Sequence, residues 1–108
     1  MYISLELAKK HLTVDFDDDD ELISTYIEDS EFFIDSMCMT GRTLSTISGT
    51  TGKIHPLTKQ AILLKIHDLY EWRGEKTSAN VFINNSITNL MYNYNYNISY
   101  EKIINDLQ

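Results

Sequence analysis

The sequence predicts an all-α fold, a small bundle of three main helices with a shorter helix before them. Apolar residues recur every three or four positions over residues 22–38, and a dense apolar segment follows a proline over residues 56–72. Residues that cap or end helices stand at the borders of these segments. A chain of 108 residues can bury one core, so we expect one helical domain over residues 1–97 and a C-terminal tail over residues 98–108 that becomes ordered on assembly.

The first helix is expected from Leu5 to Leu12, because Ser4 is placed to cap it and positive side chains stand near its end. The second is expected over residues 19–40. Asp18 and Glu21 have the spacing of a capping box, and Gly41 suits the left-handed residue that ends many helices. Its apolar positions form one stripe about 100° wide.

Residues 42–55 are rich in Thr, Ser and Gly, which favours a long loop or a weak β-hairpin between the two longest helices. Pro56 then suits the first turn of a helix that runs to Arg73 and stops at Gly74. The apolar residues of this helix cover more than one stripe. We therefore expect it at the centre of the core.

Residues 75–85 are expected to form a polar connection with a short extended piece at residues 81–83, after which Ser86 caps the last main helix. The run Tyr92–Asn97 alternates like a strand, yet it also places Tyr92, Tyr96 and Tyr100 on one helical face, so both structures stay open. Ser99 is placed to cap a short amphipathic segment in the tail.

The composition excludes several classes of protein. Sixteen acidic against nine basic side chains give a net charge of −7, which opposes binding of nucleic acid by the chain alone. Cys38 is the single cysteine, so an internal disulfide and the usual Cys-rich zinc sites are excluded. No stretch approaches the roughly 18 apolar residues of a membrane span, and we expect no membrane partner.

The acidic cluster at residues 15–21 does not match a calcium loop. Counted from Asp15, the position that requires Gly is Asp20, and the position that requires Glu is Tyr26. The cluster is better explained as the solvated first turn of a helix, where negative side chains interact favourably with the helix dipole. His67 and Glu71 share a helical face, as two metal ligands would, but no third ligand is evident.

No residue pattern indicates catalysis. The segment Ser48–Lys53 lacks the spacing of a phosphate-binding loop, and no nucleophile stands in a recognisable elbow. We expect no catalytic residue, no cofactor and no metal, and hence a protein that is not an enzyme. The tyrosine-rich run has no nearby Arg or Lys, so protein contacts are a better use for it than stacking on bases.

Four segments in order resemble the head-tail connector family of tailed bacteriophages and prophages, small adaptor proteins also described as DNA-packaging proteins. They are LELAKKHLTVD (residues 5–15), DDDELI (residues 18–23), LTKQAILL (residues 57–64) and YEWR (residues 70–73). The resemblance covers about residues 3–94. Family members usually close the third main helix with Leu-Leu-x-x-Tyr-Arg, and here Asn95 stands in place of the Arg.

The resemblance implies a structural α-helical subunit that forms a ring under the portal protein, around the DNA channel, in the virion. Its partners would be further copies of itself, the portal, and a stopper or tail-completion protein, with DNA only as passing cargo. The subunit would be made in the host cytoplasm and act at the head-tail junction. The alternatives are a helical partner-binding or regulatory domain that acts as a dimer, and a metal-dependent enzyme centred on His67 and Glu71.

A closed ring needs two different faces on each subunit. One predicted contact sets Glu28 and Asp35 against a neighbour's Lys59, Lys65 or Arg73. Tyrosines at the rim would fill gaps in this contact; they are Tyr92, Tyr94 and Tyr96. A set of acids would face the DNA channel or dock on a neighbour, namely Asp18, Asp19 and Asp20. Residues 42–55 and the tail are expected to order on docking.

Overall fold

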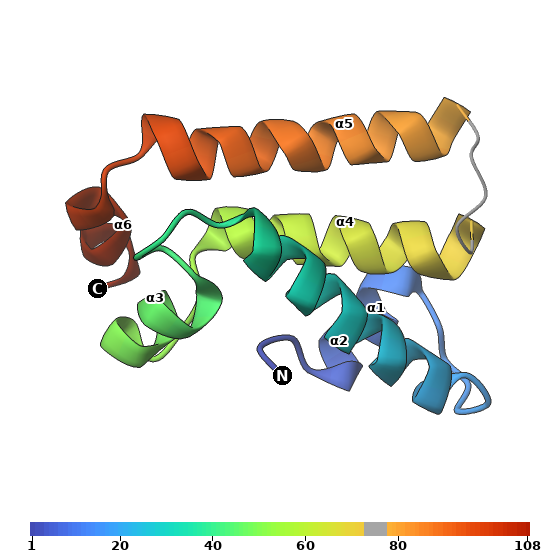
Figure 1. The fold of residues 1–108 in the computed structure, drawn as a ribbon. Helices are drawn as coiled ribbons and strands as arrows, with labels where there is room; N and C mark the ends of the chain where they lie inside the picture. The colour runs from blue at the N-terminus through green and yellow to red at the C-terminus, as the bar shows by residue number, and fades with distance from the viewer. Residues whose placement is uncertain (73–77) are drawn as a thin grey trace.

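The computed structural model describes residues 1–72 and 78–108, with the backbone alone for residues 78–80, and these residues form helices joined by short turns (Figure 1). In chain order the elements are α1 (Leu5–Leu12), α2 (Asp20–Met37), α3 (Leu44–Thr51), α4 (Pro56–Trp72), α5 (Ser78–Tyr92), the π-helical turn η1 (Asn93–Asn97) and α6 (Tyr100–Leu107). The prediction of an all-α fold is confirmed.

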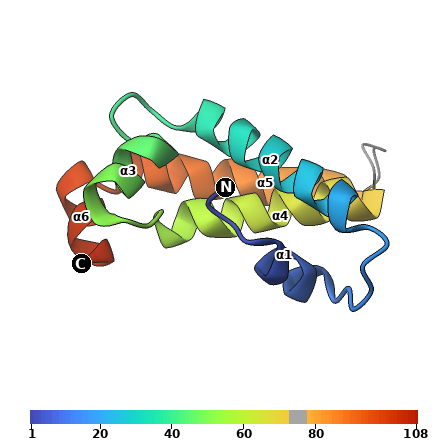
Figure 2. The ribbon, with the colours of Figure 1, turned by 90° about the horizontal axis from the view of Figure 1, so that it is seen from below.

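Helix α4 is the centre of the bundle, as its apolar sequence predicts. It contacts α1, α2 and α5, and α5 runs alongside it (Figures 1 and 2). The residues that are completely buried where these helices meet are mostly isoleucines: Ile23, Ile27 and Ile34 of α2, and Ile62 and Ile66 of α4. Each such side chain stabilises the fold by about 1.5–3 kcal/mol relative to its exposed state, so this cluster is a large favourable contribution to folding.

Helix α1 has the predicted bounds. The Ser4 hydroxyl accepts a hydrogen bond from the Leu7 N–H at 3.1 Å, and the helix ends at Thr13, which adopts a left-handed conformation with φ +56°. The segment before α1 is held by Glu31, whose carboxylate accepts the N–H groups of Tyr2 at 2.6 Å and Ile3 at 2.7 Å. A buried carboxylate on α2 thus fixes the N-terminal segment.

Helix α2 is shorter than the predicted span of residues 19–40, and the predicted capping box is wrong. Asp19 occupies the cap position but makes no cap hydrogen bond, because its carboxylate accepts the Tyr70 hydroxyl at 2.7 Å instead. The helix ends at Met37, and Gly41 serves a different purpose. It lies in the turn closed by the Arg42 N–H and the Met39 carbonyl, with φ +85°, a conformation that favours glycine.

The prediction of a loop or weak hairpin over residues 42–55 is also wrong, because eight of these residues form α3. The Thr43 hydroxyl accepts the Thr46 N–H at 3.3 Å at the start, and Gly52, with φ +82°, ends the helix. Leu44 and Ile47 are buried. Their three-residue spacing supplies the apolar face that outweighs the weak helix propensity of Thr, Ser and Gly.

Helix α5 replaces the expected extended piece at residues 81–83. Ser86 lies inside this helix rather than at its start, and its hydroxyl donates to the Phe82 carbonyl at 3.0 Å. Ile83, Ile87 and Leu90 recur along one side and pack on the core, which explains why the helix begins earlier than predicted. The predicted helix end at Arg73 and Gly74 lies outside the described residues.

The tail forms α6, which packs on α3 (Figures 1 and 2). The Ser99 hydroxyl accepts the Lys102 N–H at 3.2 Å, so the predicted cap is confirmed, and Ile103 and Leu107 are buried. Because residues 42–55 were expected to form a loop, no partner for this apolar face was evident from the sequence. The division of the chain at residue 97, with a tail that orders on assembly, stays a prediction.

Candidate assembly surfaces

The acidic loop, residues 13–19 between α1 and α2, is held in place by Lys9. The Lys9 ammonium lies 2.7 Å from Asp20 Oδ1 and 3.0 Å from Asp17 Oδ1, and the hydrogen bonds that it donates to Asp20 and then to Asp17 raise the pKa of Lys9. Near the start of the loop, Val14 is buried and its N–H donates to the Lys9 carbonyl at 2.9 Å. The loop is therefore fixed at both ends and exposes its middle.

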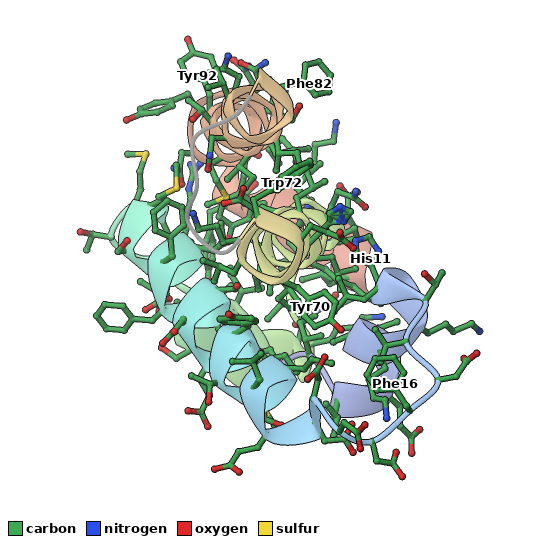
Figure 3. The ribbon with its side chains drawn as sticks, turned by 90° about the vertical axis from the view of Figure 1, so that its right-hand side faces the viewer. His11, Phe16, Tyr70, Trp72, Phe82 and Tyr92 are labelled. Carbon is green, nitrogen blue, oxygen red and sulfur yellow. The ribbon has the colours of Figure 1, made fainter. Side chains whose placement is uncertain are left out.

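The three acids predicted to face a channel or a partner have different surroundings. Asp18 is exposed, whereas Asp19 and Asp20 are half-buried. Asp19 is bonded to Tyr70 of α4, which lies between α4 and the acidic end of the molecule in Figure 3. Asp20 is bonded to Lys9. Two of the three carboxylates thus hold the subunit together.

The two acids of the predicted contact on α2 also have different surroundings. Glu28 is exposed, so its carboxylate is available to another molecule. Asp35 is half-buried, and its Oδ1 accepts the Leu44 N–H at the start of α3, at 2.9 Å. Asp35 therefore fixes the turn from α2 to α3 within the subunit.

The predicted basic partners divide in the same way. Lys59 is exposed. The Lys65 ammonium lies 3.3 Å from Asp68 Oδ2 and 4.5 Å from the centre of the Phe33 ring. It therefore forms an ion pair and a cation–π contact within its own subunit. Arg73 lies outside the described residues.

Arg42 joins the end of α5 to the turn before α3. Its Nη1 donates to three carbonyls of residues 94–98: Tyr94 at 3.2 Å, Asn95, and Ile98 at 2.8 Å. The Tyr94 hydroxyl returns the contact by donating to the Arg42 carbonyl at 2.6 Å. Burial raises the pKa of Tyr94 above its usual value, so the phenol stays a donor. We call these groups, together with Asn95, the Arg42 junction.

Asn95, at the position where the resemblance leads one to expect an arginine, is buried at the Arg42 junction. Its side chain accepts the Met39 N–H at 3.1 Å and donates to the Met37 carbonyl at 2.7 Å. It thereby satisfies backbone groups at the end of α2, which would otherwise be left without partners. The guanidinium at this end of α5 comes from Arg42 instead.

The π-helical turn decides which tyrosines of the run face solvent. The extra residue in this turn brings both Tyr94 and Asn95 inward, where they are buried. Tyr92 and Tyr96 remain exposed, with ring centres 5.0 Å apart. Of the two structures that the sequence left open for this run, the helical one is present through Asn97, and Tyr92 and Tyr96 share a face as that alternative expects. Tyr100 does not continue this face, because the helix ends at Asn97 and Tyr100 begins α6. Tyr94, one of the predicted contact residues, lies in the core, where a neighbouring subunit does not reach its ring.

The outer face of α5 carries no charge. No Asp, Glu, Lys, Arg or His occurs from residue 78 to residue 100. Phe82 and Tyr92 project from α5 away from the bundle (Figure 3), and both are more than half exposed. Aromatic residues without neighbouring charges are typical of the centre of protein–protein interfaces. We call this surface, residues 81–96 of α5 and η1, the uncharged face.

The histidines do not gather into a site. His11 and His67 lie with their ring centres 6.2 Å apart, and burial, followed by the charge of His67, lowers the pKa of His11. Burial also lowers the pKa of His55, whose Nδ1 accepts the Leu57 N–H at the start of α4. Among the described residues, no group of three His, Cys, Asp or Glu side chains could hold a metal ion. Within the same residues, no helix has the length and apolar character to cross a membrane.

Reasoning from the sequence missed Arg42, Glu31 and Asn95 as residues that hold the fold. Arg42 and Glu31 bond to segments at least 28 positions away in the chain, and no local pattern reports such distances. Asn95 stood out in the sequence only as a departure from the family pattern. Its hydrogen bonds to α2 give that departure a structural role.

Comparison of the sequence with protein families finds a match over nearly the whole chain. The family described as phage gp6-like head-tail connector protein matches residues 2–108, so the match includes the tail and the Tyr-Asn run and is wider than the four segments quoted above. Comparison with curated proteins and with solved structures gave no match. The match spans the chain from end to end, and the protein belongs to the phage gp6-like head-tail connector family.

Proposed function

We propose that the chain is a structural subunit of the head-tail connector that assembles as a ring under the portal and surrounds the DNA channel. It bridges the portal to a stopper or tail-completion protein at the head-tail junction of the virion. The observation that carries this proposal is the family match over residues 2–108. Head-tail connector proteins are structural components of the phage particle, and the proposed work of this subunit is mechanical rather than catalytic.

The surface of the subunit supports a role in assembly. A ring that closes by head-to-tail contacts requires two unlike faces on each copy. The surface of the subunit is varied enough for such contacts and for other partners: α1 and α2 form an acidic side, with eleven acidic and two basic residues over residues 1–37, and α5 carries the uncharged face. Exposed aromatics on both sides, Phe32 on α2 and Phe82 on α5, are available for contacts with other proteins.

The charge of the subunit suits a protein that lets DNA pass. A net charge of −7 offers few positions where a phosphate could displace counterions, so DNA in the channel would gain little by binding. Glu28 and Lys59 are the exposed members of the predicted acid-base contact, and Tyr92 and Tyr96 are the exposed members of the tyrosine set. We assign these four residues to contacts between proteins. The loop acids have two possible uses, the channel wall or a docking contact.

A phage that lacks this gene tests the proposal. We expect its lysate to contain DNA-filled or aborted heads and separate tails, with joined particles restored when the wild-type chain is supplied in trans. Electron micrographs of the lysate measure the fraction of joined particles. If the mutant phage joins heads to tails normally and differs only in gene expression or yield, the regulatory dimer is the correct function and the connector is not.

A further inference from the structure

We propose that the acidic loop of one subunit docks into a basic, apolar groove on the next subunit, with Phe16 as the inserted side chain. This inference rests on the proposed ring and names the surfaces that would make its head-to-tail contact. The occupant of the groove is thus a second copy of this chain.

The loop has the properties of an inserting element. Phe16 is 51 % exposed, although a large aromatic residue in a loop ordinarily packs on its own subunit when it can. Asp15 and Asp18 are exposed beside it. Lys9 holds the loop through its ion pairs with Asp17 and with Asp20, the first residue of α2. Because the loop is already fixed, docking costs little conformational entropy. Figure 3 shows Phe16 at the end of the molecule that faces the viewer.

The groove has the complementary properties. It measures about 510 Å³ and lies between the N-terminal segment, α1, the α3–α4 turn and α6. Apolar side chains line it, among them Tyr2, Leu7, Pro56 and Leu107, and so do two exposed lysines, Lys53 and Lys59. Asp106 also lines it, 4.0 Å from His55 Nε2, so two lysines stand against one carboxylate. The groove is a net positive patch on a chain of charge −7.

Charge decides which surfaces of two such copies can approach. Two chains of like charge repel each other except where opposite charges meet, and complementary patches determine the orientation of the encounter. The acidic loop and the Lys53–Lys59 groove form such a pair. Phe32, exposed on α2, is a weaker candidate for insertion. The hollow beside Phe32 shares Met1 and Tyr2 with the groove, so Phe32 lies next to the groove of its own subunit.

The positions of the two surfaces suit a ring. The molecule is 41 Å long and 18 Å thick. The acidic loop lies at one end of it, and the groove lies away from that end, between the N-terminal segment and α6, which is at the other end (Figures 1 and 2). Because the two surfaces are different parts of the subunit, a contact between them on successive copies is head-to-tail, and it leaves the uncharged face of α5 available to other proteins.

Cross-linking tests which surfaces meet. One chain carries Asp15→Cys and a second carries Pro56→Cys, and the two are mixed with the cognate portal and a short bis-maleimide. We expect a cross-linked pair in the mixture and none with either variant alone. The wild-type chain, whose Cys38 is half-buried, and a mixture of Asn89→Cys with Pro56→Cys are the matched controls. A cross-link formed by Asp15→Cys alone would indicate a two-fold dimer and overturn the inference.

A charge exchange gives an independent test. The pair Lys53→Glu and Lys59→Glu should weaken subunit association by on the order of tenfold or more, and Phe16→Ala by on the order of 30-fold. Adding Asp15→Lys and Asp18→Lys to the first pair should restore association. Lys10→Glu, an exposed lysine outside the groove, is the control for net charge.

The outcomes separate this inference from the proposed function. Rings that form on the portal without the mixed cross-link, and that tolerate the charge exchange, would overturn the docking contact and leave the connector function intact. The absence of rings and of cross-links in the presence of the portal would contradict both. Slower DNA passage through intact rings of Asp15→Lys and Asp18→Lys chains would assign the loop to the channel wall and reject docking.

Discussion

The two ends of the subunit are held together by different chemistry. At one end, the Arg42 junction joins residues more than 50 positions apart through hydrogen bonds to buried groups. At the other end, Lys9 joins the acidic loop to α1 through ion pairs with Asp17, whose side chain is 89 % exposed, and Asp20. Hydrogen bonds that are partly shielded from water cost more to break than an ion pair with an exposed partner such as Asp17.

This difference indicates separate tasks for the two ends. The Arg42 junction sets the end of α5 and the turn to α3, so it determines where the uncharged face ends. The ion pairs that position the acidic loop cost little free energy to break. This suits a surface that exchanges its own contacts for contacts with a partner. Substitutions and pH changes at each end test this contrast.

Loss of the Arg42 guanidinium should have the largest effect. Arg42→Ala leaves three carbonyls of residues 94–98 without their donor, and we expect the free energy of unfolding to fall by about 3 kcal/mol. Urea unfolding followed by circular dichroism measures this change. Arg42→Lys, which keeps the charge but loses the planar fork, should lie between the wild type and the alanine variant. A change below about 0.5 kcal/mol in Arg42→Ala would contradict the role of the junction.

High pH should weaken the same end. Burial, followed by the charge of Asp35, raises the pKa of Cys38 from 9.0 to about 12. Below pH 9 the thiol is protonated in both states and stability does not change. Above it the unfolded chain releases the proton first, so stability falls by about 1.4 kcal/mol per pH unit until the folded thiol ionises near pH 12.

Unfolding measured at pH 9 and pH 10 checks this prediction, with Cys38→Ala as the control. The alanine variant should lack the part of the slope that belongs to the thiol. Tyr94 adds a similar loss only at higher pH, because the ordinary pKa of its phenol is 10.0 and burial raises it in the folded chain. Equal slopes for the wild type and Cys38→Ala between pH 9 and pH 10 would show that the thiol is not protected by the fold.

Removal of Lys9 should have the smallest effect and the greatest dependence on salt. Lys9→Ala breaks both ion pairs of the acidic loop, so we expect a small fall in Tm at low ionic strength that shrinks as salt is added. The fall in Tm for Arg42→Ala should not depend on salt in this way. A loss for Lys9→Ala as large as that for Arg42→Ala would overturn the contrast between the two ends.

The sequence predicted those parts of the fold that depend on neighbours in the chain. Ser4 and Ser99 cap helices as expected, and the apolar sequence of α4 places it at the centre. Helix α3 was missed because its composition favours a loop, while Leu44 and Ile47 gain burial only through the folded core and α6. Propensity is a weak guide where tertiary packing decides.

The candidate surfaces could be predicted only in part. The acidic cluster and the tyrosine run were evident as sequence, but their roles depend on distant partners. Asp19 occupies the cap position of α2, but its carboxylate accepts the Tyr70 hydroxyl, and Arg42 meets Tyr94 in the core. The groove that we assign to a neighbouring copy combines residues from both ends of the chain, such as Tyr2 and Leu107, so no sequence motif reports it.

Electron microscopy of the purified chain with and without its cognate portal tests the central claim most directly. The account predicts closed rings of this chain, seated on the portal and open at the centre. Chains that ignore the portal, or that form a compact two-fold dimer whether or not it is present, would contradict it.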